Sequence, residues 1–249
     1  MRATLKQSRP VLELASVMAA PAGRTLRRYH LVKLFAACES AMVALSATRD
    51  PKQLSNGFQS AVDGFRKSWA SKLTSELFFT GPSMCPTINS GALSEPGSVS
   101  RLIIRNIPVP TSRSVQVGDV IAFSSPLALP SPSSDASTVL VRRVAAMEGD
   151  ELVAVQGGGS GDMGDEEEEV LEVPKGHCWV LADNEQLKPT EVLDSRSMGY
   201  IPLCNVIGRV IYAGSSSSDH GPVVNNPASM EEDQAVIKAE VDVDSLYDA

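Results

Sequence analysis

The seven residues Gly81–Thr87, with the sequence GPSMCPT, place one serine in a short segment that local chemistry keeps out of regular structure. Pro82 fixes its own φ near −65° and has no backbone N–H, so it stiffens the chain just before Ser83. Pro86 disfavours helical geometry at the residue before it. Met84 is apolar and can anchor the segment in a core. The pattern favours a serine hydroxyl presented on a stiff turn, and a plain surface turn is the alternative interpretation.

Three stretches occur in the order of the sequence boxes of a known family. Gly81–Thr87 is similar to the nucleophile box of type I signal peptidases, and most similar to that of the mitochondrial inner membrane proteases. Leu140–Asp150 resembles the second box, which in that family normally reads lysine-arginine-valine and ends in glycine-aspartate. The closing box is similar to a third set of residues: Asp183–Asn184, Asp194–Arg196, Gly199 and Gly208–Arg209. Together the boxes cover residues 79–212.

The resemblance implies a serine endopeptidase whose nucleophile is Ser83. In the family, a lysine held neutral by burial accepts the serine proton. Arg142 stands at the position of that lysine. A guanidinium stays protonated in proteins, so the resemblance leaves the general base unidentified. It also implies four residues that support the site: Met84, Asp194, Ser195 and Arg196.

Two adjacent arginines follow the start of the second box. In a β-strand Arg142 and Arg143 point to opposite faces, so one of them faces inward. A buried charge is costly without a partner. Because the closing box lies against the second box in the family, Asp194 is the expected carboxylate partner of Arg142. Val192 stands where the family often has a hydroxyl residue that orients the lysine.

Composition gives weaker constraints on function. The chain has 249 residues, of which 43% are hydrophobic, enough for one sizeable core. A net charge of −8 argues against a nucleic-acid partner, which would require a basic face. The 4 cysteines form no C-x-x-C pair and the 3 histidines are scattered, so neither a metal site nor a cofactor is expected. His177 remains open as a partner of the serine.

Composition also divides the chain into four segments. Residues 1–30 are basic and acid-poor, as is typical of an organelle-targeting presequence, with a disordered basic arm as the alternative. Residues 31–73 have helical spacing of apolar residues. Their apolar run is shorter than the ~20 residues of a membrane span and contains Glu39, so we expect a marginal anchor at best. Residues 74–213 are predicted to form the signal-peptidase-like domain, and residues 214–249 an acidic, disordered tail.

The main domain is predicted to be mainly β, in an α+β fold. Short branched apolar runs bounded by turn formers predict strands at residues 101–105, 120–123, 139–144 and 178–181. No amphipathic helix separates them, so we expect an antiparallel, barrel-like sheet with helices N-terminal to it, as the resemblance also implies. Two insertions, 125–137 and 157–169, are expected to be mobile surface loops.

Two functions of different classes follow from these patterns. The first is a serine endopeptidase of the signal-peptidase type that processes presequences or sorting signals at the mitochondrial inner membrane, with a chloroplast as the alternative location. Its partners would be presequence-bearing proteins and a second protease subunit, with weak or peripheral membrane association. The second is an inactive family member that binds peptides or regulates a partner subunit. A self-cleaving repressor is a more distant alternative, because no DNA-binding helix pair precedes the domain.

Overall fold

The computed structural model describes residues 10–47, 54–95, 97–127, 139–155 and 168–242. Its helices are α1 (Pro10–Ser46), α2 (Leu54–Ala70), α3 (Ser195–Met198) and α4 (Pro227–Glu240), with 3-10 turns η2 (Ser90–Leu93) and η3 (Leu203–Asn205). Its strands are β1 (Thr74–Thr80), β2 (Val99–Asn106), β3 (Val120–Ser124), β4 (Val139–Met147), β5 (Glu151–Val155), β6 (Glu168–Glu172), β7 (His177–Leu181), β8 (Ile201–Pro202), β9 (Val206–Ser216) and β10 (Asp219–Pro222).

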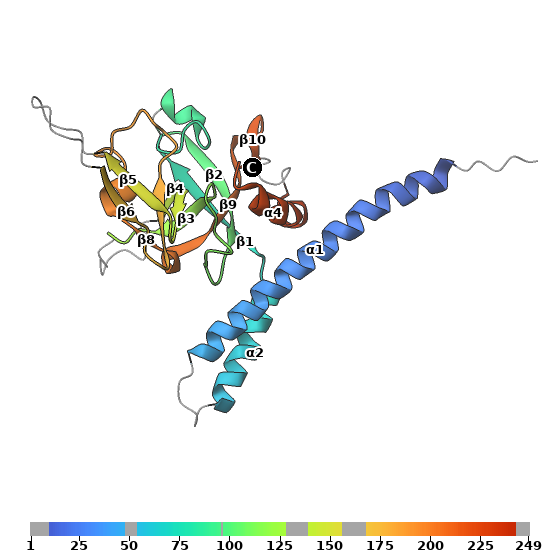
Figure 1. Ribbon diagram of the computed structural model, residues 1–249. Helices are drawn as coiled ribbons and strands as arrows, with labels where there is room; N and C mark the ends of the chain where they lie inside the picture. The colour runs from blue at the N-terminus through green and yellow to red at the C-terminus, as the bar shows by residue number, and fades with distance from the viewer. Residues whose placement is uncertain (1–9, 48–53, 96, 128–138, 156–167, 243–249) are drawn as a thin grey trace, which may run out of the picture.

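The strands form one large antiparallel sheet and a separate hairpin (Figure 1). The order in the large sheet is β1-β2-β9-β3-β4-β7-β8, with β10 added to β9, and β5 pairs with β6. Every ladder is antiparallel. The predicted mainly β, antiparallel fold is therefore confirmed, and the four predicted strands lie within β2, β3, β4 and β7. Most of the two predicted loop insertions falls outside the described residues.

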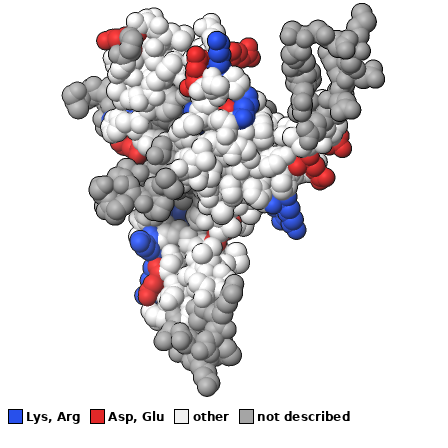
Figure 2. Space-filling view, turned by 90° about the vertical axis from the view of Figure 1, so that its left-hand side faces the viewer, with Lys and Arg blue, Asp and Glu red and all other residues white. Residues whose placement is uncertain are grey.

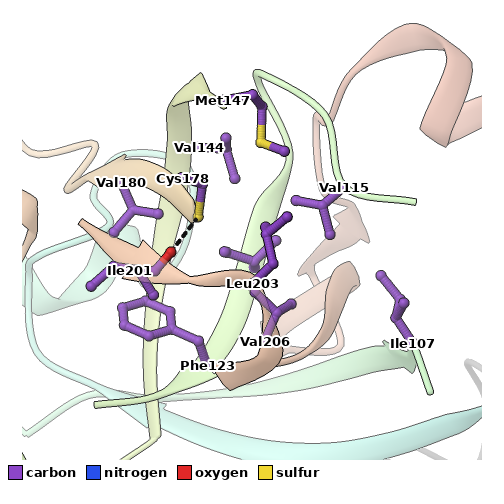
Figure 3. Packing of buried hydrophobic residues seen from close by; sticks show 11 residues of the cluster. Ile107, Val115, Phe123, Val144, Met147, Cys178, Val180, Ile201, Leu203 and Val206 are labelled. Carbon is purple, nitrogen blue, oxygen red and sulfur yellow. Dashed lines mark hydrogen bonds between the residues drawn. The ribbon is translucent and has the colours of Figure 1, made fainter. Parts of the chain in front are cut away.

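Strand β3 lies at the centre of the core because both of its faces are buried. Side chains alternate along a strand, so Ile121 and Phe123 point into one apolar cluster while Val120 and Ala122 point into another. Figure 3 shows the first cluster, in which Phe123 lies near Ile201 of β8 and which also contains residues of β4 and β7. The second cluster contains Met84, which follows the predicted nucleophile. The core thus extends directly beneath the serine turn.

The N-terminal part of the chain forms a hairpin of two helices that lie side by side (Figure 1). The helix α1 already begins at Pro10, within the segment expected to be a presequence. None of the helices in the described ranges combines the length and hydropathy of a membrane span. Large apolar side chains such as Phe35, Met42 and Phe58 are nevertheless exposed on the hairpin. On the face in Figure 2, acidic and basic side chains lie close together in several small groups, and most of the described surface between them is uncharged.

The segment after residue 213 is folded, contrary to the expected disordered tail. Strand β10 pairs with β9, and α4 packs against β9 and α1. Asn226 caps α4 by accepting a hydrogen bond from the amide of Ala228. The prediction considered only the small number of apolar residues, whereas α4 is held both by Val236, which is buried against Ile211 of β9, and by buried charges. Residues 243–249 lie outside the described ranges.

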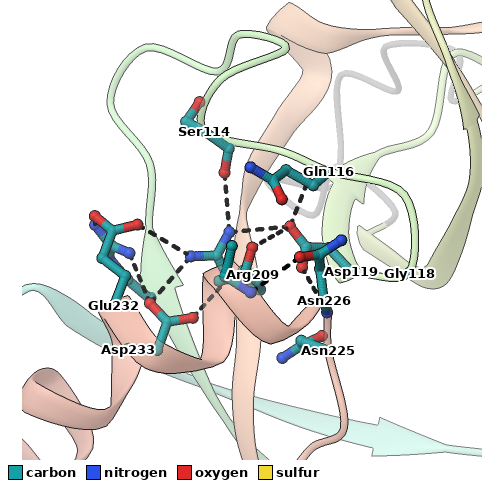
Figure 4. A network of polar contacts seen from close by, with 12 residues as sticks. Ser114, Gln116, Gly118, Asp119, Arg209, Asn225, Asn226, Glu232 and Asp233 are labelled. Atoms are coloured by element: carbon teal, nitrogen blue, oxygen red, sulfur yellow. Dashed lines mark hydrogen bonds and ion pairs between the residues drawn. The ribbon is translucent and has the colours of Figure 1, made fainter.

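Those charges centre on Arg209 of β9, which is only 1% exposed (Figure 4). Its Nε donates to Asp233 of α4 at 2.6 Å, and its Nη1 donates to Asp119 at 3.0 Å. Asp119 also accepts from the hydroxyl of Ser229, and Asp233 accepts from Arg105 of β2. Two aspartates from distant parts of the chain therefore neutralise one buried guanidinium and join α4 to the sheet.

Gly208, next to Arg209, allows β2 and β9 to approach closely. A Cβ atom at this position would overlap the backbone carbonyl oxygen of Arg105 and the side chain of Ile104. The glycine therefore fixes the spacing of two strands that both carry arginines of the buried network.

The short helix α3 begins at Asp194, whose side chain accepts from the amide of Arg196. The carboxylate also accepts from the Arg196 guanidinium at 2.7 Å and from the amide of Ala182 at 3.2 Å. Burial by itself raises the pKa of Asp194, but these hydrogen bonds outweigh it and the pKa is lowered. The ionised carboxylate thus stabilises the loop that leads into α3.

We expect Asp233→Ala to lower the free energy of unfolding by about 3–5 kcal/mol, because Arg209 and Arg105 then lose a shared carboxylate. Urea unfolding at neutral pH measures this loss. The matched control is Glu231→Ala in the same helix, whose ion pair with Arg28 is exposed, and which should cost less than about 1 kcal/mol. Equal effects of the two substitutions would contradict the role of the buried network.

We expect Asp194→Asn to destabilise the protein in a pH-dependent way. Because the folded state lowers this pKa, the contribution of the carboxylate is fully present above the unfolded value of about 4. It is lost as the pH falls through the lower, folded value. The variant should cost about 2 kcal/mol at pH 7, and the difference from wild type should shrink toward pH 3 in urea unfolding. A difference that stays constant with pH would show that the charge has no role.

Candidate functional site

Ser83 lies in an irregular turn between β1 and η2, as the sequence predicts. Gly81 has φ +90°, a conformation that favours glycine, and the amide of Cys85 donates to the carbonyl of Pro82 at 3.1 Å. Met84 is fully buried in the second apolar cluster, while Ser83 itself is partly exposed. The turn is therefore anchored by its methionine and presents the neighbouring hydroxyl to solvent.

The structure brings Ser83 and Arg142 together, although 59 residues separate them. Arg142 lies on β4, opposite Ile121 of β3. Its Nη1 donates a hydrogen bond to the Ser83 Oγ at 3.1 Å. The residues at the family's nucleophile and lysine positions thus contact each other directly.

Arg142 is held by oxygen atoms of the backbone. Its Nε donates to the carbonyl of Leu193 at 3.0 Å, and its Nη1 donates to the carbonyl of Val141. Burial lowers the pKa of the guanidinium, nearby Asp194 raises it, and Arg196 lowers it again. An arginine starts from a pKa above about 12, so Arg142 remains a cation at neutral pH.

The expected ion pair between Arg142 and Asp194 does not form. Asp194 pairs with Arg196 instead, two residues along the chain. The local pair wins because the start of α3 places Arg196 directly over the carboxylate that caps the helix. Within the described residues, Arg142 has no carboxylate within ion-pair distance.

The opposite face of β4 carries a complete ion pair. Arg143 donates from Nη2 to Asp183 at 2.7 Å and from Nη1 to the carbonyl of Gly118. The two arginines therefore point to opposite faces, as predicted, and differ in their partners. The sequence contained a signal for this pair, since Asp183 belongs to the closing box.

Asn184 is a further positioning residue, to which the sequence pattern assigned no individual role. Its side-chain Nδ2 donates to the carbonyl of Pro82 at 2.9 Å, and its backbone amide donates to the carbonyl of Ser83 at 3.1 Å. These bonds tie the serine turn to the segment that follows β7. The signal that could have identified the residue is its place in the closing box, beside Asp183.

The remaining candidates occupy supporting or distant positions. Ser195 is buried and its hydroxyl accepts from the amide of Val180, so it joins α3 to β7. Val192 is buried one residue before Leu193, whose carbonyl holds Arg142. His177 is at the far end of β7 from Asn184, where its ring contacts the carbonyl of Lys175. Because Asn184 is hydrogen-bonded to Ser83, the length of β7 separates His177 from the serine, which makes His177 unsuitable as its base.

No protein-family model matches the chain. The chain is 36% identical over 166 residues to the mitochondrial ATP-independent inner membrane protease subunit 2 of Arabidopsis thaliana, covering 67% of this chain and 70% of that protein. It is 28% identical over 132 residues to the mitochondrial inner membrane protease subunit 1 of Schizosaccharomyces pombe, covering 53% and 68%. It is 32% identical over 115 residues to the chloroplastic thylakoidal processing peptidase 1 of Arabidopsis thaliana, covering 40% and 32%.

These similarities agree with the resemblance found in the sequence boxes, and the large antiparallel sheet with N-terminal helices is consistent with the peptidase fold. The chain therefore belongs to the mitochondrial inner membrane protease family of type I signal peptidases.

Proposed function

We propose that this protein is a serine endopeptidase of the signal-peptidase type, which processes presequences or sorting signals at the mitochondrial inner membrane. Ser83 is the nucleophile. The relatives of this chain are named as proteases of that membrane and as a processing peptidase. The observation that carries the proposal is that the partly exposed Ser83 lies on an anchored turn and that its hydroxyl accepts a hydrogen bond from Arg142, at the family's second catalytic position.

The turn has the rigidity that a nucleophile requires. Buried Met84 anchors it from below, and Asn184 holds the carbonyls of Pro82 and Ser83 from the side. A nucleophile fixed in this way loses little freedom when a substrate carbonyl approaches. Asn184 is accordingly proposed to position Ser83.

Arg142 differs from the family's lysine in what it can do for the serine. It donates to Oγ, so it stabilises the negative charge that develops on that oxygen as its proton leaves. It has no lone pair to accept the serine proton. The proton must therefore leave toward a group other than Arg142, which limits the expected rate.

A second candidate function is favoured by the same residue. Arg142 and Val192 stand where an active member has its lysine and an orienting hydroxyl. An inactive member that binds peptides, or that stabilises an active partner subunit, fits this pair of changes. Two of the relatives are named as subunits of inner membrane proteases, which supports a partner subunit for this chain as well.

Ser83→Ala should abolish cleavage of a presequence peptide and labelling by a fluorophosphonate probe, with a loss of at least about 10³-fold in rate. The physical reason is the loss of the Ser83 oxygen atom that attacks the peptide carbonyl. Ser90→Ala, which changes an exposed serine in the following turn, is the matched control and should behave like wild type. Cleavage by Ser83→Ala at the wild-type rate would remove Ser83 from the mechanism.

Arg142→Lys should supply an amine that burial can hold neutral, and a positioned base contributes about 10²–10⁴-fold to rate. We expect this variant to cleave faster than wild type, and Val192→Ser to increase the gain by orienting the amine. Single-turnover cleavage of the same peptide measures both effects. Each variant is also made with Ser83→Ala, which gives the rate that does not depend on the serine.

The two candidate functions predict different rates of peptide cleavage for the wild-type protein. A silent wild type with a serine-dependent gain in the double variant supports the inactive-member function. An active wild type that Arg142→Lys slows would instead show that the arginine belongs to a working mechanism.

A further inference from the structure

Arg142 differs from the other deeply buried arginine of the sheet in having no carboxylate within ion-pair distance among the described residues. Arg209 is 1% exposed and pairs with two aspartates, whereas Arg142 is 5% exposed and contacts only a hydroxyl and two carbonyls in the described part of the chain. A buried cation without a counter-charge is costly, so the arrangement is suited to an anion that arrives from outside.

One edge of the guanidinium is available for such an anion. The Nε and Nη1 atoms of Arg142 are bonded to protein oxygens, while Nη2 has no hydrogen bond to any described residue. Arg142 is 5% exposed, so a small part of its side chain is open to solvent. The other terminal nitrogen, Nη1, donates to the hydroxyl of the partly exposed residue Ser83.

The surrounding charges do not cancel this cation. Asp194 is the carboxylate that influences Arg142, but it is already engaged by Arg196. Arg143, on the other face of β4, is paired with Asp183. These two ion pairs are each neutral, which leaves the charge of Arg142 uncompensated at the serine.

A guanidinium edge beside a hydroxyl matches the chemistry of a carboxylate. The guanidinium donates charge-assisted hydrogen bonds to carboxylate oxygen, and the Ser83 hydroxyl, which accepts from Arg142, keeps its own proton to donate to the other oxygen. We propose that Arg142 and Ser83 bind the C-terminal carboxylate of a peptide, the end that hydrolysis at Ser83 would create.

This inference rests on the proposed function only in assuming that a peptide chain reaches Ser83. In an active protease, the bound carboxylate is that of the N-terminal cleavage product, so the product inhibits the enzyme. In an inactive member, the same contact makes the protein a receptor for processed peptide ends.

The test compares two peptides on the full-length wild-type protein. A short fluorescein-labelled peptide ending in alanine is titrated by fluorescence polarisation, once as the free acid and once as the C-terminal amide. Charge-assisted hydrogen bonds predict at least about tenfold tighter binding of the acid. Equal affinities of the acid and the amide would overturn the proposal without the use of any variant.

A third peptide distinguishes the source of the carboxylate. Its last residue is an amidated aspartate in place of alanine, so the carboxylate at this end of the peptide belongs to a side chain. It should bind about as weakly as the alanine amide. If it binds as tightly as the free acid, the site reads any carboxylate and the assignment to a peptide end is wrong.

Variants then locate the contact. Arg142→Met should reduce the affinity for the acid to that for the amide, while thermal unfolding confirms that the variant is folded. Arg101→Gln removes a surface arginine of β2 and should keep the full preference for the acid. A preference that survives Arg142→Met in folded protein places the contact elsewhere and refutes the proposal.

The outcomes also separate this inference from the proposed function. Preference for the acid without any Ser83-dependent cleavage would support the carboxylate site and remove the endopeptidase activity. Ser83-dependent cleavage with equal affinity for the acid and the amide would do the reverse.

Discussion

The buried ion pairs of Arg209 hold the geometry on which the rest of the domain depends. They join α4 to β9 through Asp233, and they fix the turn before β3 through Asp119. Strand β3 lies between β9 and β4, so the position of its first residue sets the register of β4. Arg143 of β4 returns to the same turn by donating to Gly118. The network thus fixes the strand that carries Arg142 and leaves the short turn with Ser83 to be positioned by Met84 and Asn184.

Adjacent positions on β4 show how differently one sheet treats two identical side chains. Arg143 has a carboxylate and two carbonyl partners, so it braces the turn before β3 against Asp183 and the C-terminal segment. Arg142 has backbone oxygens and the Ser83 hydroxyl. Hydrogen bonds to carbonyls satisfy donors but do not neutralise charge. Arg143 is therefore a structural element, whereas Arg142 has no ion-pair partner among the described residues.

The sequence predicts the features that depend on local pattern. Branched apolar runs located β2, β3, β4 and β7, and the prolines around Ser83 predicted a turn outside regular structure.

Features that depend on pairs of distant polar residues were missed. Nothing in the sequence indicates that Asp233 meets Arg209, so composition predicts a disordered tail where α4 forms. The predicted partner of Asp194 is wrong because family geometry suggests Arg142, while the helix cap at α3 brings Arg196 nearer. Asn184 belongs to a family box, yet its bond to Pro82 is visible only in three dimensions.

A permanent cation beside a nucleophile changes which steps the site favours. In the proposed mechanism it stabilises negative charge on the Ser83 oxygen as that oxygen loses its proton, and on a carboxylate after hydrolysis, but it accepts no proton at any stage. Catalysis requires that interactions be stronger in the transition state than in the states on either side. A guanidinium that also binds the product carboxylate stabilises the end of the reaction, which slows release. In the proposed carboxylate site, an arginine in place of the family's neutral lysine therefore favours retention of a peptide end over turnover, while Met84 and Asn184 still hold the turn of Ser83.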